Sequence, residues 1–461
     1  MMAERRGRWY TCAGRGLVRW SEPSLVRTVE EGPNVTPDRW QTPPRGRGTS
    51  VLALPTVVFA VLALLLAGCD DGPPDPAVPE AVPEADGSEA ASAGSAVGWS
   101  RVAHREPVFG GRGRQQMLDV AAGGPGLVAV GLDTHRDAAA VWTSPDGSDW
   151  SRVAHDEQIL GGDGRQGMYG VAAVESGLVA VGTDGLAAAV WSSPDGTDWS
   201  RVTPGSPDLI EGSGLGMFAV TAAGPGLVAV GSDLLRDAGA VWTSTDGQDW
   251  ARVPHDDEVF ARLPEVALAL AEAPSPVSDS GSVQLSAVVA GGPGVVAVGE
   301  DGASAAVWTS EDGLVWSRVA HDEEVFGGSG RQWMAGVSTG GPGLVAVGFD
   351  EAEQAAAVWT SPDGLVWSRV AHDPQALGGS DSQSMRAVVA AGPGVVAVGG
   401  ADGDPAVWTS PDGLVWSRVP HDEDAFGGEG RRWMWAVTAG GPGLVGVGAG
   451  GNEAAGVWTS P

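Results

Sequence analysis

The sequence predicts an all-β fold, a seven-bladed β-propeller with four-stranded blades. Two tryptophan-centred segments alternate along the chain, and each is present seven times. Successive copies of the first segment are 49, 51, 66, 51, 49 and 50 residues apart. A repeat of this length that holds several short strands is typical of propeller blades.

Both repeated segments have the composition of short β-strands. They are rich in β-branched and aromatic residues, and Gly, Pro and Asp flank them. Their apolar runs scarcely alternate, which indicates strands covered on both faces by neighbouring blades. The first segment reads Val-Trp-Ser/Thr-Ser and centres on Trp142, Trp191, Trp242, Trp308, Trp359, Trp408 and Trp458. The second reads Trp-Ser/Ala-Arg-Val and centres on Trp99, Trp150, Trp199, Trp250, Trp316, Trp367 and Trp416.

The two ends of the repeat region predict how the ring closes. Six blades are complete from Met117 onward, but the seventh, from Met434 to Ser460, holds only three strands. An unpaired strand at residues 99–102 precedes the first blade. We expect it to pair with residues 457–460, because this pairing completes the last blade and removes an exposed sheet edge.

Six of the strand junctions carry the turn Ser-x-Asp-Gly-x-x-Trp, first seen from Ser144 to Trp150. We expect Ser and Asp to accept backbone N–H groups in this turn, Gly to supply a positive φ, and Trp to be buried between blades. The structural aspartates are Asp146, Asp195, Asp246, Asp312, Asp363 and Asp412.

The turn resembles the Asp-box of bacterial neuraminidase-repeat (BNR) propellers, which usually reads Ser-x-Asp-x-Gly-x-x-Trp. Here Gly follows Asp directly, one residue short of that pattern. Kelch propellers, which also repeat near fifty residues, are the second choice. Their double glycine after the second strand occurs only at Gly399-Gly400.

The region before the propeller divides into three segments. Residues 1–50 form an extension that ends in a basic flank, and its start codon could be misassigned upstream. Residues 51–69 hold an apolar run and end in Leu66-Ala67-Gly68-Cys69, which resembles a bacterial lipoprotein box with Cys69 as the lipidation site. An uncleaved N-terminal anchor is the alternative. Residues 70–97 are rich in Pro, Ala and Glu and indicate a tether to the propeller at 98–461. Both alternatives place the propeller outside the cytoplasm, anchored to the cell membrane.

Composition narrows the function classes. The formal net charge of −31 argues against nucleic-acid partners and against a basic membrane-docking surface. The only cysteines are Cys12 and Cys69, so the propeller has neither a disulfide nor a thiolate metal site. We expect a monomer without cofactor or metal; a calcium ion near the acidic loops has no supporting ligand spacing.

Long loops of about thirteen to fifteen residues follow most Trp-Ser-Arg-Val strands and must lie on one face of the ring. This long-loop face and the ring axis are the expected place for a site. Histidines recur in these loops, usually before Asp, at His104, His155, His255, His321, His372 and His421. A His-Asp pair suits metal binding or base catalysis, but one copy per blade cannot converge on a point, so a loop-anchoring hydrogen bond is the preferred interpretation.

Arginine and tryptophan give the candidate binding residues. Three positions before the inner-strand Met stand Arg114, Arg165, Arg331 and Arg431, which could meet on an anion, or could each pair with nearby acids. Trp333 and Trp433 directly precede that Met, and Trp435 is a third tryptophan outside the repeat. Their rings could stack on a sugar or peptide, or could plug the top of the ring.

These observations favour a non-catalytic, lipid-anchored scaffold that binds an envelope or extracellular protein or a glycan. The alternative is a cell-surface glycoside hydrolase, because sialidases share Asp-box propellers. The catalytic tyrosine that this resemblance implies would have to be Tyr169, and the family's Arg-Ile-Pro segment is absent. An insertion at about 261–280, with one or two expected helical turns, is either a partner contact or a tolerated surface loop.

Overall fold

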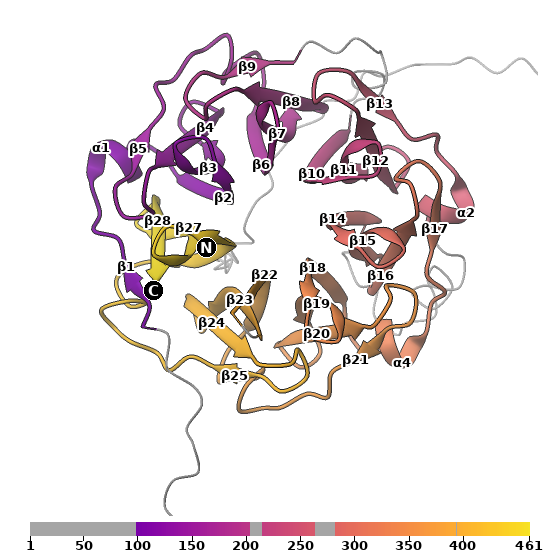
Figure 1. The fold of residues 1–461 in the computed structure, drawn as a ribbon. Helices are drawn as coiled ribbons and strands as arrows, with labels where there is room; N and C mark the ends of the chain where they lie inside the picture. The colour runs from indigo at the N-terminus through magenta and orange to yellow at the C-terminus, as the bar shows by residue number, and fades with distance from the viewer. Residues whose placement is uncertain (1–97, 203–213, 263–281, 393) are drawn as a thin grey trace, which may run out of the picture. The chain divides into compact units, whose positions relative to one another are not determined.

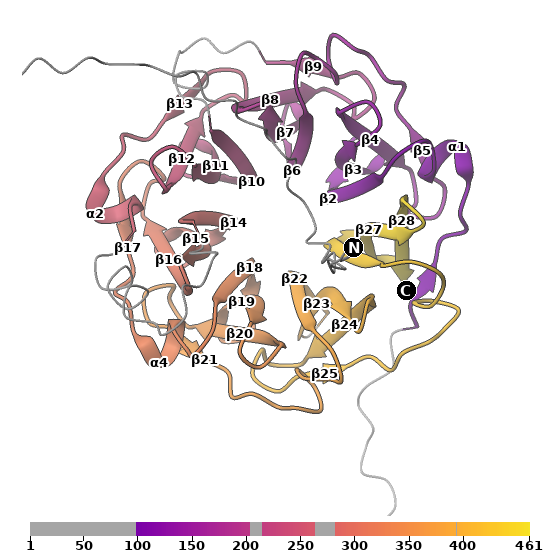
Figure 2. The same ribbon diagram turned by 180° about the vertical axis from the view of Figure 1, so that it is seen from behind.

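The computed structural model describes residues 98–202, 214–262, 282–392 and 394–461. Seven four-stranded antiparallel sheets stand around a common axis, as Figures 1 and 2 show from opposite sides. The predicted seven-bladed β-propeller is therefore confirmed. The predicted signal sequence, Cys69, the tether and nearly all of the insertion lie outside the described residues. No helix of the described residues is long and apolar enough to cross a membrane.

Each blade follows the same order, with the first strand at the ring axis and the fourth at the outer rim (Figure 1). Blade 1 holds β2 (Gln115–Gly123), β3 (Gly126–Asp133), β4 (Ala138–Ser144) and β5 (Ser151–Arg152). Blade 2 holds β6 (Gln166–Val174), β7 (Gly177–Asp184), β8 (Ala187–Ser193) and β9 (Ser200–Arg201). Blade 3 holds β10 (Leu215–Ala223), β11 (Gly226–Asp233), β12 (Ala238–Ser244) and β13 (Trp250–Arg252).

The other blades repeat this plan. Blade 4 holds β14 (Gln284–Gly291), β15 (Gly294–Asp301), β16 (Ser304–Ser310) and β17 (Trp316–Arg318). Blade 5 holds β18 (Gln332–Gly340), β19 (Gly343–Asp350), β20 (Ala355–Ser361) and β21 (Ser368–Arg369). Blade 6 holds β22 (Gln383–Ala391), β23 (Gly394–Ala401), β24 (Asp404–Ser410) and β25 (Ser417–Arg418).

Blade 7 closes the ring. Its inner strands are β26 (Trp433–Gly440), β27 (Gly443–Gly451) and β28 (Ala454–Ser460), and its outer strand is β1 (Ser100–Arg101) from the start of the propeller. In the antiparallel register, Ser100 faces Thr459 and Arg101 faces Trp458. The predicted pairing of residues 99–102 with 457–460 is confirmed. Closure matters physically because it leaves β28 without a free edge.

The hydrophobic core lies between neighbouring blades. One cluster joins Met117 and Trp142 of blade 1 to Val447 and Val457 of blade 7, and equivalent clusters occupy the other blade boundaries. The seven tryptophans of the third strands are fully buried. Each buried indole contributes about 4–6 kcal/mol of hydrophobic free energy before its entropy cost, so these rings dominate the contact between blades.

The six Ser-x-Asp-Gly turns share one hydrogen-bond pattern. In blade 5, Ser361 Oγ accepts the N–H of Gly364 at 2.7 Å, and Asp363 Oδ1 accepts two further N–H groups, those of Leu365 and Val366, at 2.9 Å each. Gly364 has φ +81°, and the N–H of the Trp367 indole bonds to its carbonyl. These backbone hydrogen bonds lower the pKa of Asp363.

Short helices in the long loops were not predicted from the sequence. They are α1 (Glu106–Phe109), α2 (Asp257–Phe260) and α4 (Glu323–Phe326), and each buries its phenylalanine. Asp322 caps α4 by accepting the N–H of Glu324. The indole of Trp359 bonds to the carbonyl of Val325 at the same helix, so a third-strand tryptophan fastens the loop to its blade.

Candidate functional site

Every inner strand carries a β-bulge at the same place. In β22 the register steps from Met385 to Ala387, which leaves Arg386 as the extra, unpaired residue. The other six inner strands shift at the equivalent position. Bulges are common beside functional sites because they redirect one side chain. We call the seven extra residues the bulge ring: Leu118, Tyr169, Phe218, Ser286, Ala335, Arg386 and Trp435.

The bulge ring is where the blades differ most. The residue before each bulge is a fully buried Met, or Leu285 in blade 4. Side chains alternate along a strand, so the bulge residue points away from that core, and all seven are partly exposed. Because the inner strands border the ring axis (Figure 2), the bulge ring supplies a set of non-identical side chains there.

One sector of this ring gathers three indoles around a guanidinium. The guanidinium carbon of Arg386 lies 5.0 Å from the ring centre of Trp435, 5.6 Å from that of Trp433 and 5.9 Å from that of Trp333. These side chains come from the neighbouring inner strands β18, β22 and β26. Such distances are within the range of cation–π attraction. We call Trp333, Arg386, Trp433 and Trp435 the Trp–Arg cluster.

Small residues of blade 6 make room for this cluster. A Cβ on Gly400 of β23 would lie 2.3 Å from Cε3 of Trp433, so only glycine allows the indole to rest there. Gly400 pairs with Ser384 of β22. The double glycine at residues 399 and 400 therefore has a local packing reason in this blade.

Arg386 has no carboxylate partner among the described residues. Its side chain is partly exposed, yet its Nε is buried without a hydrogen-bond acceptor. Burial, with a smaller effect from the nearby charge of Arg331, lowers the pKa of Arg386 to about 10. The indole N–H of Trp435 and Ser384 Oγ are also buried and find no hydrogen-bond partner in the described ranges. The cluster thus holds a positive charge and unused polar groups.

The four arginines predicted from the sequence do not meet at one point. Arg331 binds Glu300 of blade 4 through two hydrogen bonds, of 2.7 and 2.6 Å, and lies 5.1 Å from the ring centre of Trp333. Burial raises the pKa of Glu300, and the hydrogen bonds with Arg331 oppose that rise. Arg431 lies 5.9 Å from the ring centre of Trp433. These two arginines flank the Trp–Arg cluster.

Arg114 and Arg165 lie in blades 1 and 2, and no described contact joins them to the cluster. Arg165 is exposed and 3.8 Å from Asp137, whereas Arg114 is bonded through its backbone to Thr134.

The sequence analysis did not identify Arg386 as a candidate, although it had noted Trp435. A signal for Arg386 was present in the sequence: the inner-strand Met recurs in most blades, whereas the residue that follows it changes from blade to blade.

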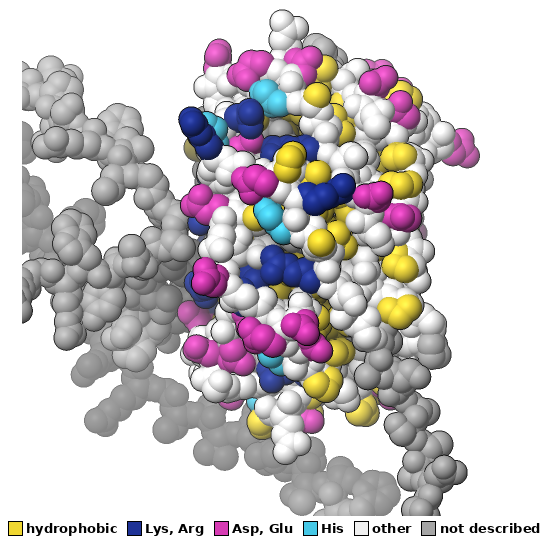
Figure 3. Space-filling model, turned by 90° about the vertical axis from the view of Figure 1, so that its left-hand side faces the viewer, with side chains coloured by type: hydrophobic (Ala, Val, Ile, Leu, Met, Phe, Trp, Pro, Cys, Tyr) yellow, Lys and Arg dark blue, Asp and Glu magenta, His cyan; other side chains and the backbone are white. Residues whose placement is uncertain are grey.

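The recurring histidines are held within their own loops. The Nε2 atoms of His104, His155, His321 and His421 lie 3.0–3.3 Å from the glutamate two residues ahead, and that of His255 lies 2.9 Å from Asp257. The adjacent Asp does not orient the ring. Figure 3 shows histidines spaced along the outer wall beside acidic and basic side chains. No three His, Cys, Asp or Glu side chains of the described ranges converge in a way that could hold a metal ion.

Tyr169 and Asp119 complete the polar groups at the ring axis. Tyr169 packs edge-on against Phe218, with ring centres 5.9 Å apart. Asp119 accepts the N–H groups of Val120 and of Val171 in blade 2, each at 2.8 Å. Burial raises the pKa of Asp119 to about 6, and these hydrogen bonds oppose the rise. Oδ2 of Asp119 thus joins blade 1 to blade 2, and Oδ1 is held by the next residue of its own strand.

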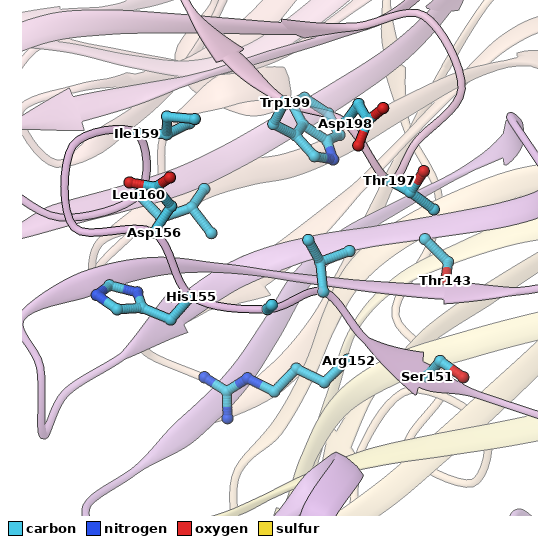
Figure 4. A pocket seen from close by; sticks show the side chains of 12 residues that line it. Thr143, Ser151, Arg152, His155, Asp156, Ile159, Leu160, Thr197, Asp198 and Trp199 are labelled. Carbon is cyan, nitrogen blue, oxygen red and sulfur yellow. The ribbon is translucent and has the colours of Figure 1, made fainter.

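A pocket of about 590 Å³ lies at the outer rim between blades 1 and 2 (Figure 4). Its two basic side chains already have acidic partners: Arg152 binds Asp133 at 3.0 Å, and His155 binds Glu157. Similar hollows lie beside His421 and His104. These hollows recur where long loops meet outer strands, so they follow the repeat rather than mark one site.

A family model for a propeller domain agrees with the fold. Residues 134–326 match the family described as DUF6242 beta propeller domain, which is less than half of the chain. Two similar solved structures are the WD40 beta propeller domain of Doa1, with 10% identity over 79% of this chain and 98% of that chain at a TM-score of 0.44, and a streptogramin B lyase, with 9% identity over 79% and 97% at a TM-score of 0.46. No curated protein matches the sequence.

Proposed function

We propose that this protein is a lipid-anchored, extracytoplasmic propeller that binds a protein or a glycan, without catalysis, at the Trp–Arg cluster. The anchor and the location rest on the Leu66-to-Cys69 segment, the preceding apolar run and the Pro-rich residues 70–97. The observation that carries the binding proposal is Arg386, which is surrounded by three partly exposed indoles and has no counter-ion within the described part of the chain.

The chemistry of the cluster supports ligand binding. Indole faces offer a large apolar surface at a small entropy cost, and a guanidinium adds directed hydrogen bonds. These side chains occupy positions where the seven blades differ, whereas the repeated parts of the blades serve packing and turns. A single asymmetric sector on a symmetric scaffold suits one specific ligand.

The acids and the tyrosine near the axis give no observation that favours a hydrolase. Asp119 bridges two blades, Glu300 is bound by Arg331, and Tyr169 packs on Phe218. A glycosidase mechanism needs two carboxyl groups facing one substrate, and these described groups have other structural contacts.

Binding to immobilised glycan and protein panels tests the proposal with the full-length chain. Trp333→Ala combined with Trp433→Ala should abolish selective binding and leave the fold intact. Arg331 should stay unchanged in this variant, because its removal leaves Glu300 as an unpaired buried acid. Arg165→Ala, an exposed arginine in blade 2, is the control. Selective binding that persists in the double variant would refute the proposed site, and turnover of aryl glycosides would favour a hydrolase instead.

A further inference from the structure

Five of the seven blades pair a tryptophan-stacked arginine with a carboxylate, whereas in blade 7 Arg101 lies over Trp458 and bonds to the carbonyl of Gly450 instead. Five outer-strand arginines lie over a third-strand tryptophan and also pair with an aspartate of the same blade: Arg152, Arg201, Arg252, Arg318 and Arg369. In blade 5, Arg369 lies 4.7 Å from the ring centre of Trp359 and 2.7 Å from Asp350. The indole binds one face of the cation, and the carboxylate neutralises its charge.

Arg386 has the indole contacts of this arrangement but lacks the paired carboxylate among the described residues. Three indoles surround it, but the described residues supply it with no carboxylate. A partly buried cation without an anion is costly, and among the described residues neither the Nε of Arg386 nor the N–H of Trp435 has an acceptor. In the five paired blades the partner of the stacked arginine is a carboxylate, so an anionic acceptor would complete the same arrangement at Arg386.

The surrounding charges agree with this conclusion. Arg431 flanks the cluster at Trp433, and Arg331, which is paired with Glu300, flanks it at Trp333. Arg386 and Arg431 therefore make this sector positive in a chain with net charge −31. Arg331 is held by Glu300, which fixes it beside Trp333. An acidic protein that keeps a cationic patch at one sector of its axis is suited to attract an anion there.

We infer that the cluster binds a carboxylate-bearing sugar unit, such as a uronate in an acidic polysaccharide. This inference rests on the proposed function and names its ligand class. The planar guanidinium of Arg386 matches a carboxylate in a bidentate geometry. The apolar face of the sugar ring then packs on the indoles of Trp433 and Trp333, which are partly exposed.

The test is titration of the full-length chain with oligogalacturonate and with a neutral galactose oligosaccharide of equal length, followed by calorimetry and tryptophan fluorescence. We expect the acidic sugar to bind and the neutral one to bind much more weakly. Arg386→Gln should weaken binding of the acidic sugar about tenfold to a hundredfold. Arg165→Gln, which removes the same charge from an exposed site, should leave binding unchanged.

Two results would overturn the inference. Equal binding of the acidic and neutral sugars, both lost in Trp433→Ala, would retain the proposed function but reject an anionic ligand. Absence of uronate binding by the wild-type chain, or uronate binding that is unaffected by Arg386→Gln, would also reject it. The glycan and protein panels then decide the proposed function separately. Near-UV circular dichroism of each variant verifies that the indole packing outside the site is retained.

Discussion

The guanidinium carbon of Arg386 lies 5.0 Å from the ring centre of Trp435, and both residues are the bulge residues of adjacent inner strands. The bulge takes both side chains out of the regular strand pairing and lets them meet across the blade boundary. A repeated irregularity of the backbone thus allows a sector in which the side chains depart from the symmetry of the propeller.

Arg318 and Arg386 should respond differently to the same substitution. Arg318 is nearly buried and lies 2.7 Å from the fully buried Asp301. Arg318→Gln removes this pairing and should cost about 3 kcal/mol of unfolding free energy. Arg386→Gln removes an uncompensated cation and should cost less than about 1 kcal/mol, because only cation–π contacts are lost. Denaturant unfolding without ligand measures both, and a larger loss for Arg386 would contradict its lack of a counter-ion.

Gly400→Ala should disturb the Trp–Arg cluster directly. The new Cβ would overlap the indole of Trp433, so the ring must move. We expect a loss of about 1–3 kcal/mol of stability and a changed near-UV circular dichroism spectrum. Gly98→Ala is the matched control, since a Cβ there meets no atom within 4 Å. An unchanged spectrum in Gly400→Ala would show that Trp433 is not seated on blade 6.

Asp119 should give the protein a specific pH dependence. Its pKa is raised to about 6 in the folded state, so the native protein holds this proton more tightly than the unfolded chain does. The free energy of unfolding contributed by Asp119 therefore falls as pH rises from about 4 to 6, by up to about 3 kcal/mol.

Asp119→Ala is the informative variant because Ala occupies the equivalent position as Ala219, Ala287, Ala387 and Ala436. As the pH rises from 4 to 7, the free energy of unfolding of the variant should increase relative to that of the wild type. Urea unfolding at several pH values measures it. Parallel curves across this range would mean that Asp119 does not titrate there.

Although β1 is only two residues long, ring closure by β1 should contribute strongly to thermal stability and to the monomeric state. Deletion of residues 99–102 leaves β28 with a free edge and removes Trp99, which is buried in blade 7. We expect a lower melting temperature and concentration-dependent association through that edge. Size-exclusion chromatography and thermal unfolding measure both effects. A four-residue deletion within residues 70–97 is the control, and equal behaviour of the two deletions would argue against closure by this strand.

The repeat made much of the fold predictable. The spacing of the tryptophans predicted the number of blades. The unpaired strand at residues 99–102 and the incomplete last blade predicted how the ring closes. Both predictions are confirmed because strand pairing and blade packing depend on local pattern repeated seven times. The short helices were missed, although Asp322 before Glu323-Glu324 is an N-cap signal. The sequence did not name the histidine partners: five of the six rings contact the acid two residues ahead in the same loop, not the adjacent residue.

The sequence by itself determined the architecture, since hydrophobic periodicity and turn residues act within each repeat. It also singled out Trp333, Trp433 and Trp435 as tryptophans outside the repeat. Only the tertiary structure decided that Arg386 joins them and that Arg331 is bound to Glu300. These contacts link residues of different blades, and a bulge one residue long determines where each side chain points. Such pairing across blade boundaries depends on the closed ring and leaves no spacing pattern in the chain.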